Sequence, residues 1–266
     1  MLNRIWQWHF GEGLVRTPSN FGRLGEPPTH PELLDFLAKR FIESGWSMKT
    51  MHKMLMLSST YRMSAEVTAE QMKRDPANLL LSHFNRRRLD IEEIRDAMLA
   101  IDGTVDLTMR GSLQEGKGTD VEFSEARMSF NPEKSRRRTV YLPLRRSNLP
   151  SLLTLFDFGD ATTTGEGRSR TNIAPQALFM MNSAFVAERA RGLAKALVAD
   201  SGENDTRFRR AWLLTTGHAP ADEELRDAQE YIRGFERKWS GPDPRLAAWE
   251  SLCRVLMASN DFVYVN

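Results

Sequence analysis

The chain has 266 residues, of which 41% are hydrophobic and 27% charged, and its formal net charge at pH 7 is +2. This composition is that of an ordinary globular protein, and it excludes a collagen, a low-complexity chain and a disordered chain. No apolar run approaches the roughly 18 residues of a membrane-spanning helix, so we expect no membrane span. The near balance of charge argues against nucleic acid as a partner.

The basic residues are unevenly divided, because 29 of the 37 are arginine. A guanidinium binds carboxylates and phosphates through a planar fork and tolerates burial in ion pairs. A genome that favours arginine would produce the same bias, so the bias alone identifies no ligand. The single cysteine, Cys253, lies in an apolar helical pattern and is expected to be a small buried hydrophobe.

Several kinds of chemical motif are missing. The five histidines show no i,i+4 pair, and the chain has no His-Glu-x-x-His, no Cys-x-x-Cys-His and no Gly-x-Ser-x-Gly. We therefore expect neither a metal site nor a cofactor within this chain. Gly165 and Gly167 lack the third glycine of a dinucleotide loop.

Residues 1–103 are predicted to form a helical N-terminal part. A helix over 2–10 precedes an irregular Gly/Pro-rich segment, and Thr29 and Glu32 have the spacing of a capping box that opens the next helix. Gly45 ends that helix, and Ser47 caps another, so the two should form a helical hairpin.

Another capped helix is predicted from Asp90 to about Ile101. Residues 104–172 then form a polar insertion. Apolar residues show no periodicity over 104–138, where a small β-hairpin would fit. A strand is predicted over 139–144, and Pro143 restricts it to the edge of a sheet. The insertion ends in a polar loop.

Residues 173–266 are predicted to be helical almost throughout, with helices at about 174–181, 183–200, 205–216, 221–239 and 244–259. The fold class is therefore mainly α: an irregular or orthogonal helical bundle with a long polar insertion and at most a small β-hairpin. We expect the three parts, 1–103, 104–172 and 173–266, to form one compact domain.

The segment 157–176 is the best candidate for a binding site, because long polar loops in compact domains are often functional and this one ends at a helix start. An anionic ligand would meet two guanidinium forks there. The candidate binding residues are Arg168, Arg170, Thr171, Asn172 and Gln176. The alternative is that the arginines pair with Asp157, Asp160 or Glu166 and brace the loop.

Two arginine runs, 86–88 and 136–138, are similarly ambiguous. Local ion pairing, for the first run with Asp90, Glu92, Glu93 and Asp96, explains them, and so does an anionic partner. The aromatic cluster of Trp6, Trp8, His9 and Phe10 is more typical of a core than of a sugar- or haem-binding face.

An enzymatic interpretation would use carboxylates near these arginines as general acid and base. The weak catalytic candidates are His30, Glu32, Asp35, Asp157 and Asp160. They would serve a hydrolase acting on an anionic polysaccharide or a similar extracellular substrate.

Several ordered segments together resemble one family. They are Asn3–Val15, Thr17–Gly22, Gly25–Asp35, Ser58–Arg62, Arg88–Asp96 and Arg170–Leu178. The chain is similar, over residues 2 to about 262, to the planctomycete cytochrome-c-associated family known as domain of unknown function 1553.

The resemblance implies a mostly helical domain, usually the C-terminal part of a larger exported protein with a cytochrome-c-like segment upstream. It implies haem on such an upstream segment, and as partners the upstream domains of the same protein or a haem-bearing protein. A periplasmic or secreted location follows for a longer chain, and a cytoplasmic one if this chain is complete. The family has no established activity, so no catalytic residue is carried over.

We therefore interpret the chain first as an interaction or binding module that works with a cytochrome-c-like redox segment. The hydrolase is the alternative. A purely structural domain that stabilises its upstream neighbour is the third interpretation.

Overall fold

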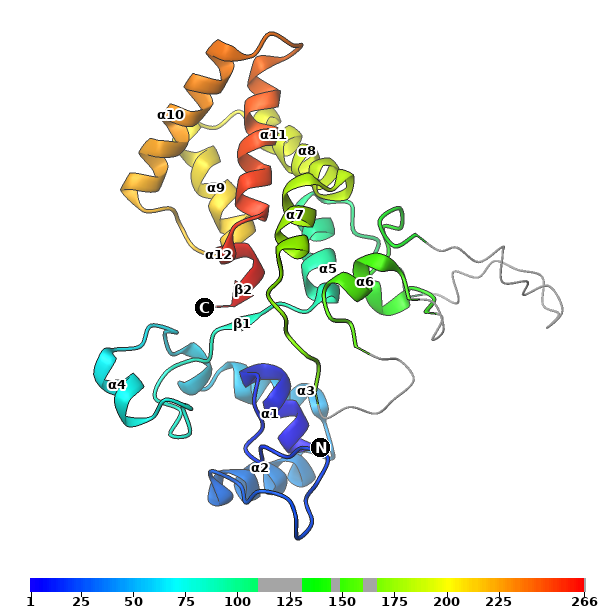
Figure 1. Ribbon diagram of the computed structural model, residues 1–266, viewed down its shortest axis with the longest axis vertical. Helices are drawn as coiled ribbons and strands as arrows, with labels where there is room; N and C mark the ends of the chain where they lie inside the picture. Colours follow the sequence, from blue (N-terminus) through cyan, green and yellow to red (C-terminus); the bar gives the residue numbers. More distant parts are fainter. Residues whose placement is uncertain (110–130, 145–148, 160–166, 266) are drawn as a thin grey trace, which may run out of the picture. The chain divides into compact units, whose positions relative to one another are not determined.

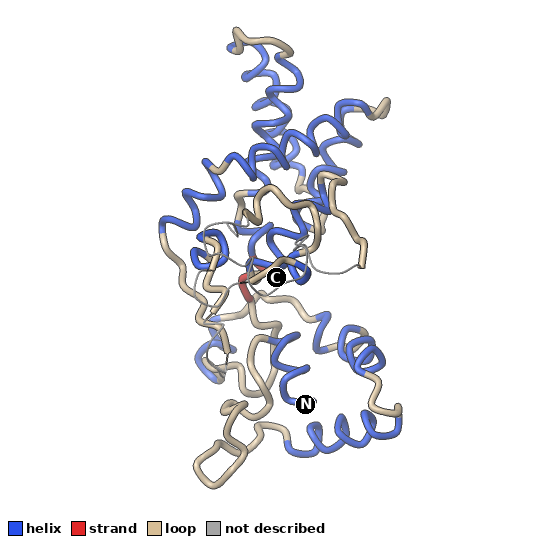
Figure 2. The backbone as a smooth tube through the Cα atoms, turned by 90° about the vertical axis from the view of Figure 1, so that its right-hand side faces the viewer, coloured by secondary structure: helices blue, strands red, loops and turns tan. Residues whose placement is uncertain are grey.

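The computed structural model describes residues 1–109, 131–144, 149–159 and 167–265 (Figure 1). In this part of the chain the regular structure is almost entirely helical, which confirms the mainly α fold (Figure 2). The sheet seen among the described residues pairs β1 (Arg87–Arg88) with β2 (Tyr264–Val265). These strands lie far apart in sequence, so the sheet is not a hairpin.

Contacts within the chain divide the described residues into two units. The first contains Met1–Arg87 with Gly167 and Val265, and the second contains the rest, from Arg88 to Tyr264. This division differs from the three parts expected from the sequence, which remain a prediction.

The first unit is built on three helices, α1 (Leu2–Phe10), α2 (Pro31–Glu43) and α3 (Met48–Met56). Two short elements follow, η1 (Thr60–Arg62) and α4 (Ala69–Arg74). The unit's core contains Ile5, Trp6, Phe10, Leu37, Phe41, Met51, Leu55 and Phe84. Trp6 stacks on Phe10 with ring centroids 4.1 Å apart, so these two aromatic residues of the predicted cluster are core residues. Trp8, by contrast, is exposed.

The predicted capping box at Thr29 is wrong. The N-cap of α2 is His30, whose side chain makes no capping hydrogen bond. Both the backbone N–H and the hydroxyl of Thr29 donate instead to the carbonyl of Leu14, at 2.8 and 3.3 Å. Thr29 is thus used to hold the preceding irregular segment. Ser47 caps α3 as predicted, accepting from the N–H of Thr50.

The second unit holds the remaining elements. They are α5 (Ile91–Ile101), η3 (Thr139–Tyr141), α6 (Ser151–Leu155), α7 (Ala174–Asn182), α8 (Ala184–Ala199), α9 (Asn204–Thr216), α10 (Asp222–Lys238), α11 (Pro244–Met257) and α12 (Asn260–Val263). The C-terminal helices lie within one or two residues of their predicted bounds. The last of them stops at Met257. Ser259 then caps the separate helix α12, accepting a hydrogen bond from the N–H of Phe262.

The core of this unit is centred on α8 and α11, which pack closely against each other. Ala190 and Ala194 on α8 and Ala248 on α11 are small buried residues of this core. Cys253 lies fully buried in this contact, as expected. Burial, and then the nearby Glu250, raise the pKa of its thiol, so it remains an unreactive thiol.

The strand predicted over 139–144 is also wrong, because Thr139–Tyr141 forms the 3-10 turn η3. The N–H and hydroxyl of Thr139 both donate to Asp96 Oδ1, at 2.8 and 2.6 Å. The N–H groups of Tyr141 and Leu142 bond back to Arg138 and Thr139. Because these donors are used locally, none of them joins a sheet ladder.

A fully buried arginine on α5 anchors the described part of the insertion. Arg95 donates to the backbone carbonyls of Pro132, Ser135 and Arg137 and to the hydroxyl of Thr139, at 2.5 to 3.1 Å. The hairpin suggested within 104–138 falls largely on residues outside the described part. The pairing seen there is a single parallel bridge between Asp106 and Arg137.

Candidate functional site

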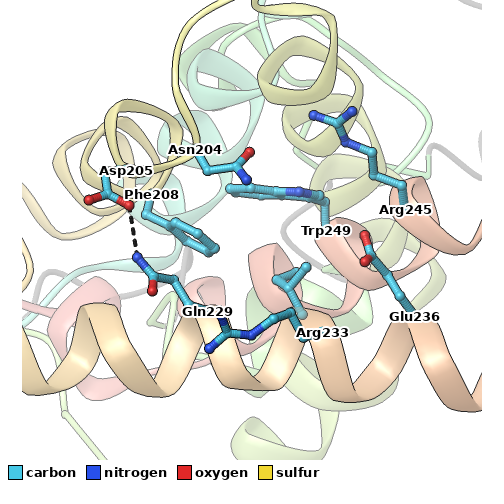
Figure 3. A pocket seen from close by; sticks show the side chains of 9 residues that line it. Asn204, Asp205, Phe208, Gln229, Arg233, Glu236, Arg245 and Trp249 are labelled. Carbon is cyan, nitrogen blue, oxygen red and sulfur yellow. Dashed lines mark hydrogen bonds between the residues drawn. The ribbon is translucent and has the colours of Figure 1, made fainter.

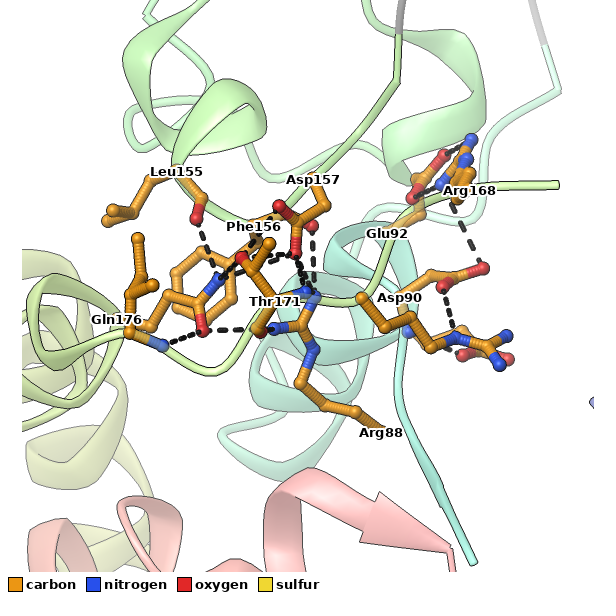
Figure 4. A network of polar contacts seen from close by, with 12 residues as sticks. Arg88, Asp90, Glu92, Leu155, Phe156, Asp157, Arg168, Thr171 and Gln176 are labelled. Atoms are coloured by element: carbon orange, nitrogen blue, oxygen red, sulfur yellow. Dashed lines mark hydrogen bonds and ion pairs between the residues drawn. The ribbon is translucent and has the colours of Figure 1, made fainter. Parts of the chain in front are cut away.

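The predicted binding loop is organised by Arg88, which lies at the start of the second unit (Figure 4). Its Nη2 forms an ion pair of 2.7 Å with Asp157 Oδ2 and its Nη1 donates to Gln176 Oε1 at 2.9 Å. Nη1 also donates to the carbonyl of Thr171, and the guanidinium lies over the ring of Phe156. Arg88 therefore ties together three segments of the second unit.

The carboxylate of Asp157 is saturated with donors. Besides Arg88, it accepts from the backbone N–H of Thr171 at 2.8 Å and from the Thr171 hydroxyl at 2.8 and 2.9 Å. Burial alone would raise the pKa of Asp157, but the bonds from Arg88 and Thr171 outweigh it and hold this pKa below its usual value. Asp157 is thus ionised and both of its carboxylate oxygens accept hydrogen bonds, so this residue is unsuited to act as a general acid.

Gln176 completes this network from the first turn of α7. Its Nε2 donates to the carbonyl of Leu155 at 3.0 Å, and its Oε1 accepts from Arg88. The side chain is buried, so all its hydrogen-bonding capacity is directed into the protein. Thr171 and Gln176, predicted as ligand-binding residues, bind the protein's own loop in the described structure.

Arg168 and Arg170 pair with carboxylates at the start of α5. Arg168 makes a bidentate contact with Glu92, at 2.6 and 2.7 Å, and lies 4.7 Å over the ring of Phe158. Arg170 Nε lies 3.8 Å from Asp90. The bracing alternative named Asp157, Asp160 and Glu166 as partners. The described partners are different residues, far away in sequence.

Asp90 lies among several charges. Burial, and repulsion from Glu93 and Glu92, raise the pKa of its carboxyl, although Arg168 and Arg170 pull in the opposite direction. Glu93 also accepts a 2.8 Å bond from the Asp90 N–H, as a capping residue does. The start of α5 is therefore a negatively charged end that the loop arginines neutralise.

Local ion pairing of the first arginine run is wrong for Arg88, whose partner Asp157 is 69 residues away. In the second run Arg138 also pairs with a residue that is distant in sequence, since its Nε lies 3.6 Å from Asp96 Oδ2.

The other predicted residues lie in several places. His30, Glu32 and Asp35 belong to the first unit, around the start of α2, where Glu32 and Asp35 are exposed. Asn172 is exposed and makes no side-chain hydrogen bond to the described residues. Asp160 lies outside the described part of the chain. Within a single unit, the structure thus brings together Asp157, Thr171 and Gln176 but no predicted pair of catalytic carboxylates.

A second site, which the sequence did not indicate, is a cavity of about 630 Å³ between α9, α10 and α11 (Figure 3). Its polar lining residues are Asn204, Asp205, Gln229, Arg233, Glu236 and Arg245. Phe208 and Trp249, stacked with centroids 4.7 Å apart, form its apolar wall with Ile232. The pocket lies wholly within the second unit.

The cavity's cationic groups differ from those of the loop, because Arg233 and Arg245 have no carboxylate partner among the described residues. Both side chains are exposed, and Figure 3 shows them on different helices that border the same space. Asp205 is held by a 2.8 Å bond from Gln229. The pocket thus presents two guanidinium groups without a carboxylate partner, beside amide groups and the carboxylates of Asp205 and Glu236.

Sequence spacing could not have indicated this pocket. Its residues come from three helices, and its polar residues have the spacing of ordinary polar positions on amphipathic helices. Only the packing of α9 and α11 on α10 brings them together.

The described residues contain no group of three or more His, Cys, Asp or Glu side chains suited to a metal ion. None of the helices described is long and apolar enough to cross a bilayer.

Fold and pocket together define a mainly α-helical protein with a polar, arginine-lined pocket between three helices. The chain belongs to the family described as "PSD1: Protein of unknown function (DUF1553)", whose sequence profile matches residues 1–232. No curated protein and no solved structure matches the chain. The matched range ends within α10, so Arg233, Glu236, Arg245 and Trp249 lie beyond it.

Proposed function

We propose that this chain is a binding module for an anionic ligand, and that the ligand binds between α9, α10 and α11. The observation that carries the proposal is that Arg233 and Arg245 border one cavity and have no acidic partner in the described structure. Some arginines elsewhere in the second unit are paired, as Arg168 is with Glu92 and Arg191 with Glu250.

The chemistry of the pocket favours a carboxylate or phosphate group over a cation. A guanidinium offers two parallel N–H donors to such a group. Asp205 accepts a hydrogen bond from Gln229, and neither Asp205 nor Glu236 forms an ion pair with these arginines among the described residues. Asn204 adds an exposed amide to the pocket wall, which suits hydroxyl groups of a ligand.

The test measures binding by isothermal titration calorimetry with phosphate, citrate and D-glucuronate as probes. We expect the double variant Arg233→Gln, Arg245→Gln to weaken binding at least tenfold, since each charged hydrogen bond contributes roughly 1.5 to 3 kcal/mol. Arg226→Gln, on α10 but outside the pocket, is the matched control. Equal affinities of the double variant and the wild type would refute the proposal.

A second candidate function, interaction with a haem-bearing segment, is favoured by the turn between α2 and α3. Trp46 is 65% exposed there, with a backbone φ of 63°, and the exposed Ile42 and Met48 flank it. A bulky residue with positive φ is strained, and such strain is often kept for function. An apolar docking surface for a protein partner accounts for both features.

This candidate is tested on the native protein isolated with an antibody against the chain. A heavier or associated species with c-type haem absorbance supports it, and we expect Trp46→Ser to lower the amount of haem protein recovered. A haem-free species of 30.4 kDa contradicts it. Hydrolysis of an anionic polysaccharide remains an alternative prediction, for which no paired carboxylates are assembled within either unit as described.

A further inference from the structure

A row of aromatic side chains runs along α10 beside the pocket. Tyr231, Phe235 and Trp239 follow one another at i, i+4 and i+8, with ring centroids 6.1 and 5.4 Å apart. Together with Gly234 and Lys238 they line a shallow cavity of about 440 Å³. Tyr231 is 38% and Trp239 43% exposed, so this row presents aromatic surface to solvent.

The rings at the two ends of the row are held in place by contacts within the second unit. The Tyr231 hydroxyl and the Ser251 hydroxyl share a 2.6 Å hydrogen bond, and Trp239 Nε1 donates to the carbonyl of Pro242 at 3.1 Å. Gly241 lies against the indole so closely that a Cβ there would be 2.8 Å from the ring. Because the polar atoms of Tyr231 and Trp239 are bound to the protein, what these rings offer a ligand is their apolar surface.

The row and the pocket occupy neighbouring sides of one helix. An α-helix turns about 100° per residue, so Arg233 and Glu236 project from one side of α10 and the aromatic row from the adjacent side. Lys238 adds a cation beside the row. A ligand that extends from the pocket around α10 would meet guanidinium groups on one side of this helix and aromatic rings on the other.

We propose that the ligand of this module is a chain of sugar acids. This inference rests on the proposed anion site and names its ligand class. The carboxylates of such a chain suit the forks of Arg233 and Arg245, while the apolar C–H faces of its rings suit Tyr231, Phe235 and Trp239. Aromatic faces carry negative charge density and attract polarised C–H groups. A small inorganic anion would use the pocket but not the row.

The experiment compares four probes: hexagalacturonate, monomeric galacturonate, uncharged cellohexaose and poly-glutamate. For the wild type we expect hexagalacturonate to bind most tightly. Trp239→Ala should weaken hexagalacturonate about three- to tenfold and leave monomeric galacturonate unchanged, whereas Trp239→Phe should keep most of the affinity. Trp8→Ala removes an exposed tryptophan from α1 and is the matched control.

The two proposals fail differently. If the monomer binds through Arg233 and Arg245 but the hexamer binds no more tightly, or Trp239→Ala has no effect, the sugar-acid inference is overturned and the anion site stands. Equal binding of poly-glutamate overturns it in favour of an acidic peptide. Binding of cellohexaose that needs Trp239, without binding of any anion, refutes the anion site and with it the acidic ligand. Circular dichroism of each variant confirms that the helices are intact.

Discussion

Arg88 and Asp157 form an ion pair of 2.7 Å across 69 residues of sequence, with side chains only 6% and 13% exposed. Thr171 and Gln176 share in the same network, so the loop before α7 is bound to the start of α5 through Arg88. Thr171 and Gln176, which were predicted to bind a ligand, thus stabilise the protein's own loop.

We expect Arg88→Met to lower the free energy of unfolding by roughly 3 to 5 kcal/mol, because it leaves the buried Asp157 carboxylate without its cation. Urea denaturation followed by circular dichroism measures this. Arg168→Met is the control. Its pair with Glu92 is about one-third exposed, so it should cost about 1 kcal/mol or less. Equal effects of the two substitutions would show that the Arg88–Asp157 pair contributes no more to stability than the Arg168–Glu92 pair.

Substitution of Arg95 is expected to destabilise the protein to a similar extent, and its effect can be measured in the segment that Arg95 holds. Burial lowers the pKa of this guanidinium, but it stays charged, and it holds the carbonyls of Pro132, Ser135 and Arg137. Arg95→Met should release the segment, so trypsin should cut after Arg136, Arg137 and Arg138 faster than in the wild type.

The rate of appearance of these fragments by mass spectrometry is the measurement. Arg191→Met, which removes an exposed arginine of α8, should leave the rate unchanged. Unchanged cleavage of the Arg95 variant would mean that other contacts hold the segment.

Two glycines in helix interiors should respond to alanine with opposite signs. A Cβ at Gly192 on α8 would lie 2.8 Å from Asp102 Cβ, whereas nothing lies within 4 Å of one at Gly234 on α10. Gly234→Ala should stabilise the protein by about 0.5 to 1 kcal/mol through helix propensity. Gly192→Ala should destabilise it, since Asp102 is held by a buried ion pair with Arg189 and cannot move away freely. Melting temperatures measure both, and a stabilising Gly192→Ala would disprove the steric argument.

The first unit should lose stability in mild acid because of a histidine pair between α1 and α3. His9 Nε2 lies 2.8 Å from His52 Nδ1, so in the neutral pair one ring donates and the other accepts. Burial, then His52 and Arg87, lower the pKa of His9. His9 is thus neutral in the folded protein at a pH where the unfolded chain already binds a proton.

The pair's contribution is present above the unfolded histidine pKa, about 6.5, and is lost as the pH falls from there through the lower folded value. Amide hydrogen exchange of α1 and α3 between pH 7.5 and 5.5 should show this loss. His9→Gln should flatten the pH dependence, whereas His218→Gln in the second unit should not. Identical slopes for wild type and His9→Gln would exclude the pair as the cause.

Local signals predicted local structure well. Hydrophobic periodicity predicted the C-terminal helices, and Ser47 caps its helix as expected. Thr29 and the segment 139–144 failed because their donors bind Leu14 and Asp96, partners that no local rule can see.

The sequence alone determined the helical class, because the spacing of apolar residues decides which face each helix buries, and family membership follows from ordered motifs. Only the tertiary structure decided which charges are free. Arg168, Arg170, Arg233 and Arg245 are alike as residues, yet the first two lie beside the carboxylates of α5 and the last two lie beside an open cavity. The availability of a guanidinium depends on what the packing of distant helices places within about 4 Å of it, and the order of residues along the chain does not contain that distance.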